Sequence, residues 1–436
     1  MKTSEWIGVL PKAFIILAFC NFIIGAILGG LMASLPQLWG TIGAIHGEIN
    51  PYGWLTMMIY GMTYAVLSTS AGLKPPRPAM VWLHACVAEA SVVVVVIAYL
   101  FHAFHLLQAG LILQALAPVL FLANILSAVY TARRTKSGLQ ASEQVAKNDE
   151  TNTFPAELGF LRPAVMHKAT DRVAQRGTDV ALMIFILAAW WTSVALLFRA
   201  GVWTDAAFPQ SATLLTYYGW IAGTVLSVAL HLYPRFLNAP LVNAKSALIG
   251  QVLWGAALVF ILIGSVWTSM IFTIGSRILG VAFVWHALCY LSTLHRRRPI
   301  TDGSAVMPLQ SVVAWYVSWG FALALGISLV LGVDPLSLAA LHMLFLGWVT
   351  TLVYGVGYSL LPMFFGKISP DNRVITAQLT CSVAGAVLMV ASLLWMNIAP
   401  AYGSTANQVV LGVGGTLAAG GALIFLLSWP LARNRL

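Results

Sequence analysis

The chain has 436 residues, of which 60% are hydrophobic and only 8% are charged. So few charged residues could not cover the surface of a globule of this size, which excludes a soluble domain and indicates a protein that crosses a membrane many times. The formal net charge of +10 is explained below by membrane orientation, so no nucleic-acid partner is expected. The four cysteines lie singly in apolar stretches and predict neither a disulfide framework nor a paired-thiol metal site.

Apolar windows predict twelve membrane-spanning helices in contact with lipid, which makes the fold class an all-α membrane protein. Their expected ranges are 13–34, 44–69, 79–104, 107–131, 178–199, 212–235, 246–266, 271–294, 310–333, 337–361, 374–398 and 408–430. The first range has no small-residue cleavage site after a short apolar core. We interpret it as a retained helix and not as a signal peptide.

The basic residues predict the orientation of these helices. If every odd-numbered span runs outward, the basic segment 133–177 and the His-Arg-Arg-Arg sequence at 295–298 face the cytoplasm. Only Arg199 and Arg277, of 23 Lys and Arg residues, then lie on the outer side. Because cytoplasmic loops carry the excess of Lys and Arg, both chain termini are expected in the cytoplasm.

A repeated motif divides the chain into units. GWLTMMIYGMTYAVL at 53–67 and GWVTTLVYGVGYSLL at 347–361 share seven residue identities, and a weaker copy begins at Gly219. These copies fall on spans 2, 6 and 10, which predicts three four-helix pseudo-repeats. The expected organisation of this single membrane domain is helices 1–4 in 1–132, a polar cytoplasmic linker in 133–177, helices 5–8 in 178–294 and helices 9–12 in 295–436. The position of the long linker argues against a two-times-six transporter fold.

His46 and His342 are the strongest candidates for a site. Each precedes the Gly-Trp pair of its repeat, near the start of an inward-running span, so both imidazoles are expected at a similar depth. Two neutral imidazoles on facing helices can occupy the two axial positions of a heme iron. The alternative is two unrelated buried histidines, each bonded to a backbone carbonyl. The Asn50-Pro51 pair after His46 predicts a kink in span 2.

Other ionisable residues within the spans are site candidates because a charge in the membrane is costly. Glu48 lies close to His46 in the sequence, and could set the tautomer of that imidazole, relay a proton or cap span 2. Glu89, His231 and His286 also fall within spans, and their sequence surroundings give them no role.

Twelve spans in three units, a span-2 His46-Gly47 pair and a span-10 His342 six residues before Trp348 together resemble the catalytic subunit I of heme-copper oxidases. The likeness is nearest to the C-family, which contains the cytochrome cbb group and related nitric oxide reductases. In that family the corresponding histidines hold the low-spin heme. The resemblance therefore implies one low-spin heme b held by His46 and His342, in a protein of the inner (plasma) membrane.

The chain departs from that family where oxygen is reduced. Ala340 stands where the family has the histidine of the high-spin heme, while Trp220 and the SVWTSM sequence at 265–270 stand near the places of the copper ligands. The resemblance thus implies no copper and no oxygen-reducing site. Because outer arginines bind heme propionates in the family, Arg199 and Arg277 become candidates for that role. The alternative is that each of these arginines lies near a helix end and extends its charged group to the membrane surface.

Three functions stay open at this point. The first is a heme b protein for respiratory electron transfer or for chemistry linked to nitric oxide or oxygen, with quinol or a cytochrome as electron donor and with room for a partner subunit. The second is a heme-free membrane transporter or assembly protein on the same scaffold. The third is a cytochrome c oxidase or nitric oxide reductase subunit with atypical ligands.

Overall fold

A computed structural model describes residues 9–69, 76–134, 168–198, 207–297, 309–365, 369–398 and 404–431. Within these ranges every regular element is a helix, which confirms the predicted all-α class. Eleven helices in this part of the chain are long and apolar enough to cross a membrane. The protein is therefore a multi-pass membrane protein.

The helices follow the predicted order. The first unit contains α1 (Val9–Ser34), η2 (Pro36–Leu38), α2 (Trp39–Glu48), η3 (Ile49–Thr56), α3 (Met57–Thr69), α4 (Pro78–Leu100) and α5 (Phe104–Arg134). The second contains α7 (Ala169–Phe198), α8 (Ala207–Leu214), η7 (Leu215–Ile221), α9 (Ala222–Phe236), α10 (Ala244–Val266) and α11 (Ser269–His295). The third contains α12 (Leu309–Val330), α13 (Leu338–His342), η8 (Met343–Thr350), α14 (Thr351–Phe365), α15 (Asn372–Ile398) and α16 (Thr405–Leu431).

The predicted second span, 44–69, is not among these eleven helices. It corresponds to α2, η3 and α3, which form an unbroken helical run from Trp39 to Thr69. Its hydropathy is lower than that of the other spans because it is rich in Gly, Thr, Tyr and Trp and also carries His46, Glu48 and Asn50. The count of twelve spans and the cytoplasmic location of both termini stay predictions.

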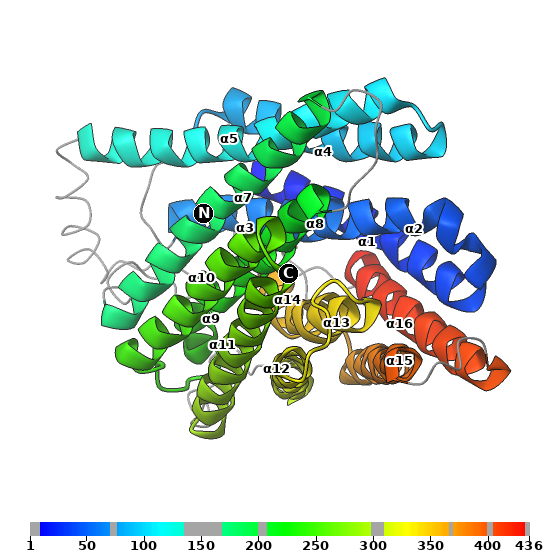
Figure 1. Ribbon diagram of the computed structural model, residues 1–436. Coiled ribbons are helices and arrows are strands. Elements are labelled where there is room, and N and C mark those ends of the chain that lie inside the picture. The colour runs from blue at the N-terminus through cyan, green and yellow to red at the C-terminus, as the bar shows by residue number, and fades with distance from the viewer. Residues whose placement is uncertain are drawn as a thin grey trace.

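Nine of the described helices contact one another in a ring that surrounds three central helical runs. Along the ring α1 contacts α4, and the order continues through α5, α7, α10, α11, α12, α15 and α16 back to α1. The helical runs α2–η3–α3, α8–η7–α9 and α13–η8–α14 are the second helices of the three units and lie inside this ring. In Figure 1, α1 to α5 occupy the upper part of the view, and α12 to α16 lie at the lower right.

The repeated Gly-Trp motif has the same structure in each unit. Residues 49–56, 215–221 and 343–350 each form a π-helical segment within the central helix. The tryptophan of each segment packs on an aromatic ring from the first helix of its unit. The ring centroids are 4.2 Å apart for Trp54 and Phe22, 4.8 Å for Trp220 and Phe185, and 5.5 Å for Trp348 and Trp319. This repeated geometry supports the three-unit prediction.

The predicted linker is shorter than expected at both ends. Helix α5 continues to Arg134, and α7 begins at Ala169, inside the range 133–177 that was expected to be a linker. The early start has a physical cause: Asp171 in the first turns of α7 forms a buried ion pair with Arg235 of α9. The nearest atoms of this pair, Nη1 and Oδ1, are 2.8 Å apart. A polar stretch that looks like a linker is thereby ordered as helix.

Candidate functional site

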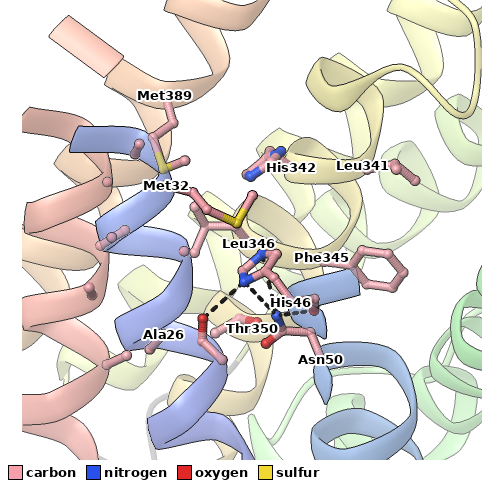
Figure 2. Close-up of a pocket in the computed structure, with 18 of the residues that line it drawn as sticks. Ala26, Met32, His46, Asn50, Leu341, His342, Phe345, Leu346, Thr350 and Met389 are labelled. Carbon is pink, nitrogen blue, oxygen red and sulfur yellow. Dashed lines mark hydrogen bonds between the residues drawn. The ribbon is translucent and has the colours of Figure 1, made fainter. Parts of the chain in front are cut away.

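His46 and His342, which lie 296 residues apart in the sequence, line one cavity. The cavity has a volume of about 390 Å³, within the range of about 300–1,000 Å³ typical of small-molecule and cofactor sites. Its walls come mainly from α1, α2, η3, α13, η8, α15 and α16, with Tyr217 of η7 and Tyr354 of α14, so it lies between the first and third units and touches the second. Figure 2 shows the two imidazoles projecting into this space from different helices.

The His46 ring is oriented by a backbone carbonyl of the neighbouring helix. Its Nδ1 lies 3.0 Å from the carbonyl oxygen of Gly25 in α1. A carbonyl can only accept, so Nδ1 carries the proton and Nε2 keeps its lone pair. The amide nitrogen of Asn50 lies beside the ring, 3.2 Å from Nδ1 and 3.4 Å from Nε2, and donates to the His46 carbonyl oxygen at 2.9 Å. The contacts of Gly25 and Asn50 with the His46 ring appear as dashed lines in Figure 2.

His342 has the same hydrogen-bonding arrangement. Its Nδ1 lies 2.7 Å from the carbonyl oxygen of Leu338, one turn earlier in the same helix. The proton is again on Nδ1, which leaves the Nε2 lone pair available. Metal-binding histidines typically donate their second ring N–H to a carbonyl or carboxylate in this way, because the bond fixes the ring orientation and the tautomer. Both rings therefore have the backbone hydrogen bond that such ligands typically make.

The distortion of span 2 occurs where the Asn50-Pro51 pair predicted it. Pro51 has no N–H to donate to the carbonyl of Gly47, one turn earlier, and the helix over 49–56 widens into the π form. The hydroxyl of Tyr217, from η7 in the second unit, donates to the Gly47 carbonyl at 3.4 Å. The carbonyl that proline leaves without its helical partner is thus bound by another unit, directly beside His46.

Small residues on α1 make room for the His46 ring. A Cβ atom added at Gly29 would lie 2.7 Å from Cε1 of the His46 imidazole. A Cβ at Gly25 would lie 2.5 Å from Oδ1 of Asn50, so that position is also restricted to glycine. The spacing of Gly25 and Gly29 in the sequence GAILG is the small-xxx-small pattern of closely packed membrane helices.

We expect Gly29→Ala to weaken ligation by His46, because the added methyl group would push the imidazole from its position. The measurement is the optical spectrum of the purified protein and its heme content per chain. Gly40→Ala is the matched control, since a Cβ at Gly40 in α2 would meet nothing within 4 Å. Equal spectra for the two variants would show that the position of the His46 ring does not matter to the site.

Two soft sulfur donors also line the cavity. Met32 of α1 and Met389 of α15 line the cavity together with the two histidines, and Figure 2 shows both thioethers on the same side as the imidazoles. Among the described residues, no group of three or more His, Cys, Asp or Glu side chains could hold a metal ion. Within the part of the chain that the structure describes, the cavity therefore offers two imidazoles and two thioethers as possible ligands.

Arg277 does not supply a positive charge to this cavity. Arg277 is exposed on α11, outside the set of helices that form the cavity walls. Arg199 lies outside the described residues. No Lys or Arg is found among the described residues that line the cavity. The geometry therefore gives no support to propionate binding by Arg277.

Glu48 faces away from the cavity. Its carboxylate is buried and accepts a 2.6 Å hydrogen bond from Nε2 of Gln114 in α5. The tautomer of His46 is set by the Gly25 carbonyl and not by Glu48. His231 and His286 also lie outside the cavity lining, on α9 and α11. The structure brings together only His46 and His342 among the ionisable candidates.

Ala340 and Trp220, which the resemblance aligns with ligand positions of the family's second heme and copper, are packed and buried. Ala340 is completely buried, and Trp220 is 1% exposed. The indole Nε1 of Trp220 donates to Oγ1 of Thr56 at 3.0 Å, while its ring stacks on Phe185. Neither residue can act as a ligand, and neither lines the cavity.

Comparison with protein-family models and with curated proteins gives no match for this chain. The functional argument therefore rests on the cavity itself. Sequence reasoning found its two imidazoles but not Met32, Met389 or the role of Gly29. The spacing of Gly25 and Gly29 could have indicated a close helix contact at Gly29. Met32 and Met389 could not be distinguished from the other apolar residues of their spans.

Proposed function

We propose that this protein is a heme b protein of the inner (plasma) membrane, in which His46 and His342 hold one low-spin heme. The observation that carries the proposal is that both imidazoles reach one cavity with Nδ1 bonded to a backbone carbonyl and the Nε2 lone pair left for a metal. When bound, the heme would supply a centre that takes up and releases one electron at a time.

The residues of the chain would do three things at this site. Leu338 and Gly25 would hold the imidazole rings in orientation through their carbonyls. Gly29 would leave space for the His46 ring, and the mostly apolar walls would keep water away. An apolar, insulated site with both axial positions filled suits electron transfer better than oxygen reduction, with quinol or a cytochrome as the donor.

The purified protein should show a Soret band and a sharp α band on reduction, at one heme per chain. Since two imidazoles would fill both axial positions, the reduced protein should bind carbon monoxide poorly. A large carbon monoxide shift would mean that one of the two ligands is wrong. A protein isolated without any Soret band, even after heme is supplied, would contradict heme binding altogether.

A second candidate function is favoured by the two thioethers. Two imidazoles and two methionine sulfurs around one cavity also suit Cu(I), which prefers soft ligands. A heme-free transporter or assembly protein that handles Cu(I) would use the same four side chains. Metal analysis of the purified protein separates the two functions, and we expect iron and no stoichiometric copper.

The packing around Ala340 and Trp220 supports a proposal in which the protein has no oxidase or reductase centre. Detection of a second, high-spin heme would revive the reading of the chain as a cytochrome c oxidase or nitric oxide reductase subunit with atypical ligands. The same measurement of heme per chain decides this question.

A further inference from the structure

Glu89 is an acid at the middle of a membrane helix and plays no part in the cavity. It lies 11 residues from each end of α4 (Pro78–Leu100), which places it about 16 Å from either end at the helical rise per residue. Its side chain is half-buried. An ionisable group at this depth is costly to the protein and is retained when a partner satisfies it.

The hydrogen bonds that the described residues make to Glu89 leave its carboxylate short of donors. Nδ2 of Asn21 in α1 lies 3.0 Å from one carboxylate oxygen and 3.3 Å from the other. The same nitrogen donates to the carbonyl of Gly53 at 3.2 Å, so one of its two hydrogens is used there. A carboxylate accepts about four hydrogen bonds, and a single shared N–H fills only part of that capacity.

The carboxylate lies at the border of an outward apolar face on α1 and α4, which we call the α1–α4 face. The exposed residues of this face are Ile16, Cys20, Ile24, Ile27, Cys86, Val93 and Ile97. Cys20 directly precedes Asn21, and Cys86 is one turn before Glu89. Lipid chains can cover the apolar residues, but they offer no donor to the carboxylate.

We propose that the α1–α4 face is the docking site of a single transmembrane helix from another membrane protein, which presents a Lys or Arg at its middle to Glu89. The charge of such a residue complements the carboxylate, and its donors fill the acceptor positions that Asn21 leaves open. The rest of the partner helix is apolar and packs on the exposed isoleucines. This inference is independent of heme binding.

A second copy of the chain is a poorer occupant. Among the described residues, Arg277 on α11 is the exposed base that falls within a predicted span (271–294), whereas Arg172 and Arg176 of α7 precede the predicted span 178–199. In the ring of described helices α11 lies four positions from α4 in one direction and four from α1 in the other. A contact between opposite sides of the molecule would repeat head to tail without closing, as open arrays do.

The test is photo-cross-linking in native membranes with the full chain. A benzophenone amino acid replaces Ile24 or Val93 on the α1–α4 face, both of which are nearly half exposed, and Val281 on α11, with the same 45% exposure as Val93, is the control position. We expect one discrete protein adduct from the first two positions and none from Val281. The sequence of that adduct should contain a single apolar span with Lys or Arg near its middle.

Variants at Glu89 then test the ion pair. Glu89→Leu should lower the adduct yield about tenfold or more, because the partner's base would be left buried without its acid. Exchanging the charges, with Glu89→Lys in this chain and acid in place of the partner's base, should restore the yield. Unchanged membrane levels and helical circular dichroism of the Glu89→Leu chain exclude misfolding as the cause.

Several outcomes would overturn the proposal. Adducts with lipid alone would mean that the α1–α4 face is covered by the bilayer, and adducts with another copy of this chain would mean a homo-oligomer. An adduct whose yield survives Glu89→Leu, or a partner span without a basic residue, would remove the ion pair from the interface. The same holds if the charge exchange fails to restore the yield.

Discussion

Alanine in place of His46 or His342 is expected to abolish the low-spin heme spectrum or to convert it to a high-spin one. Each imidazole reaches the cavity from a different helix, and neither has a neighbouring histidine among the described residues of the cavity wall that could replace it. Losing one axial ligand opens a coordination position, so the His342→Ala protein should also gain carbon monoxide binding. Absorption spectra of the oxidised, reduced and carbon-monoxide-treated protein measure all three effects.

The matched controls are His231→Ala and His286→Ala. Both histidines lie in membrane helices, as the candidate ligands do, but neither lines the cavity. Their spectra should equal that of the unaltered protein. If the His342→Ala protein keeps its spectrum, the pair of ligands is wrong and the two histidines are packing residues, each satisfied by its backbone carbonyl.

The locations of the helices could be predicted well because hydropathy depends on each segment alone. The expected span 246–266 is observed as Ala244–Val266, and the expected span 374–398 as Asn372–Ile398. The repeated Gly-Trp motif likewise indicated which helices are related. It could not reveal that each copy widens into a π-helix, because that form depends on hydrogen bonds made by the folded backbone.

The candidate site could be predicted only in part. His46 and His342 were found because a histidine in an apolar span stands out, and the shared repeat placed them at one depth. The groups that hold their rings are backbone carbonyls of Gly25 and Leu338, which no side-chain pattern reveals. Glu48 is close to His46 in sequence, yet two residues along a helix turn a side chain to another face, and there it meets Gln114.

Asp171 shows a different limit of sequence reasoning. Its surroundings are polar, so composition assigned it to a linker, and its partner Arg235 lies 64 residues further along the chain. In the structure both side chains are buried, 6% and 8% exposed, and they form two hydrogen bonds of 2.8 and 2.9 Å. The pair ties the first turns of α7 to the end of α9.

Asp171→Ala should therefore be among the most destabilising substitutions in the chain. It would remove the carboxylate from the buried Arg235 guanidinium, and breaking a buried ion pair by removing one partner costs about 3–5 kcal/mol. The measurement is thermal unfolding of the purified protein by circular dichroism. The double variant Asp171→Ala with Arg235→Leu should recover most of the loss, because no buried charge is then left uncompensated. If the double variant is as unstable as the single one, the contact of α7 with α9 depends on packing and not on the charge pair.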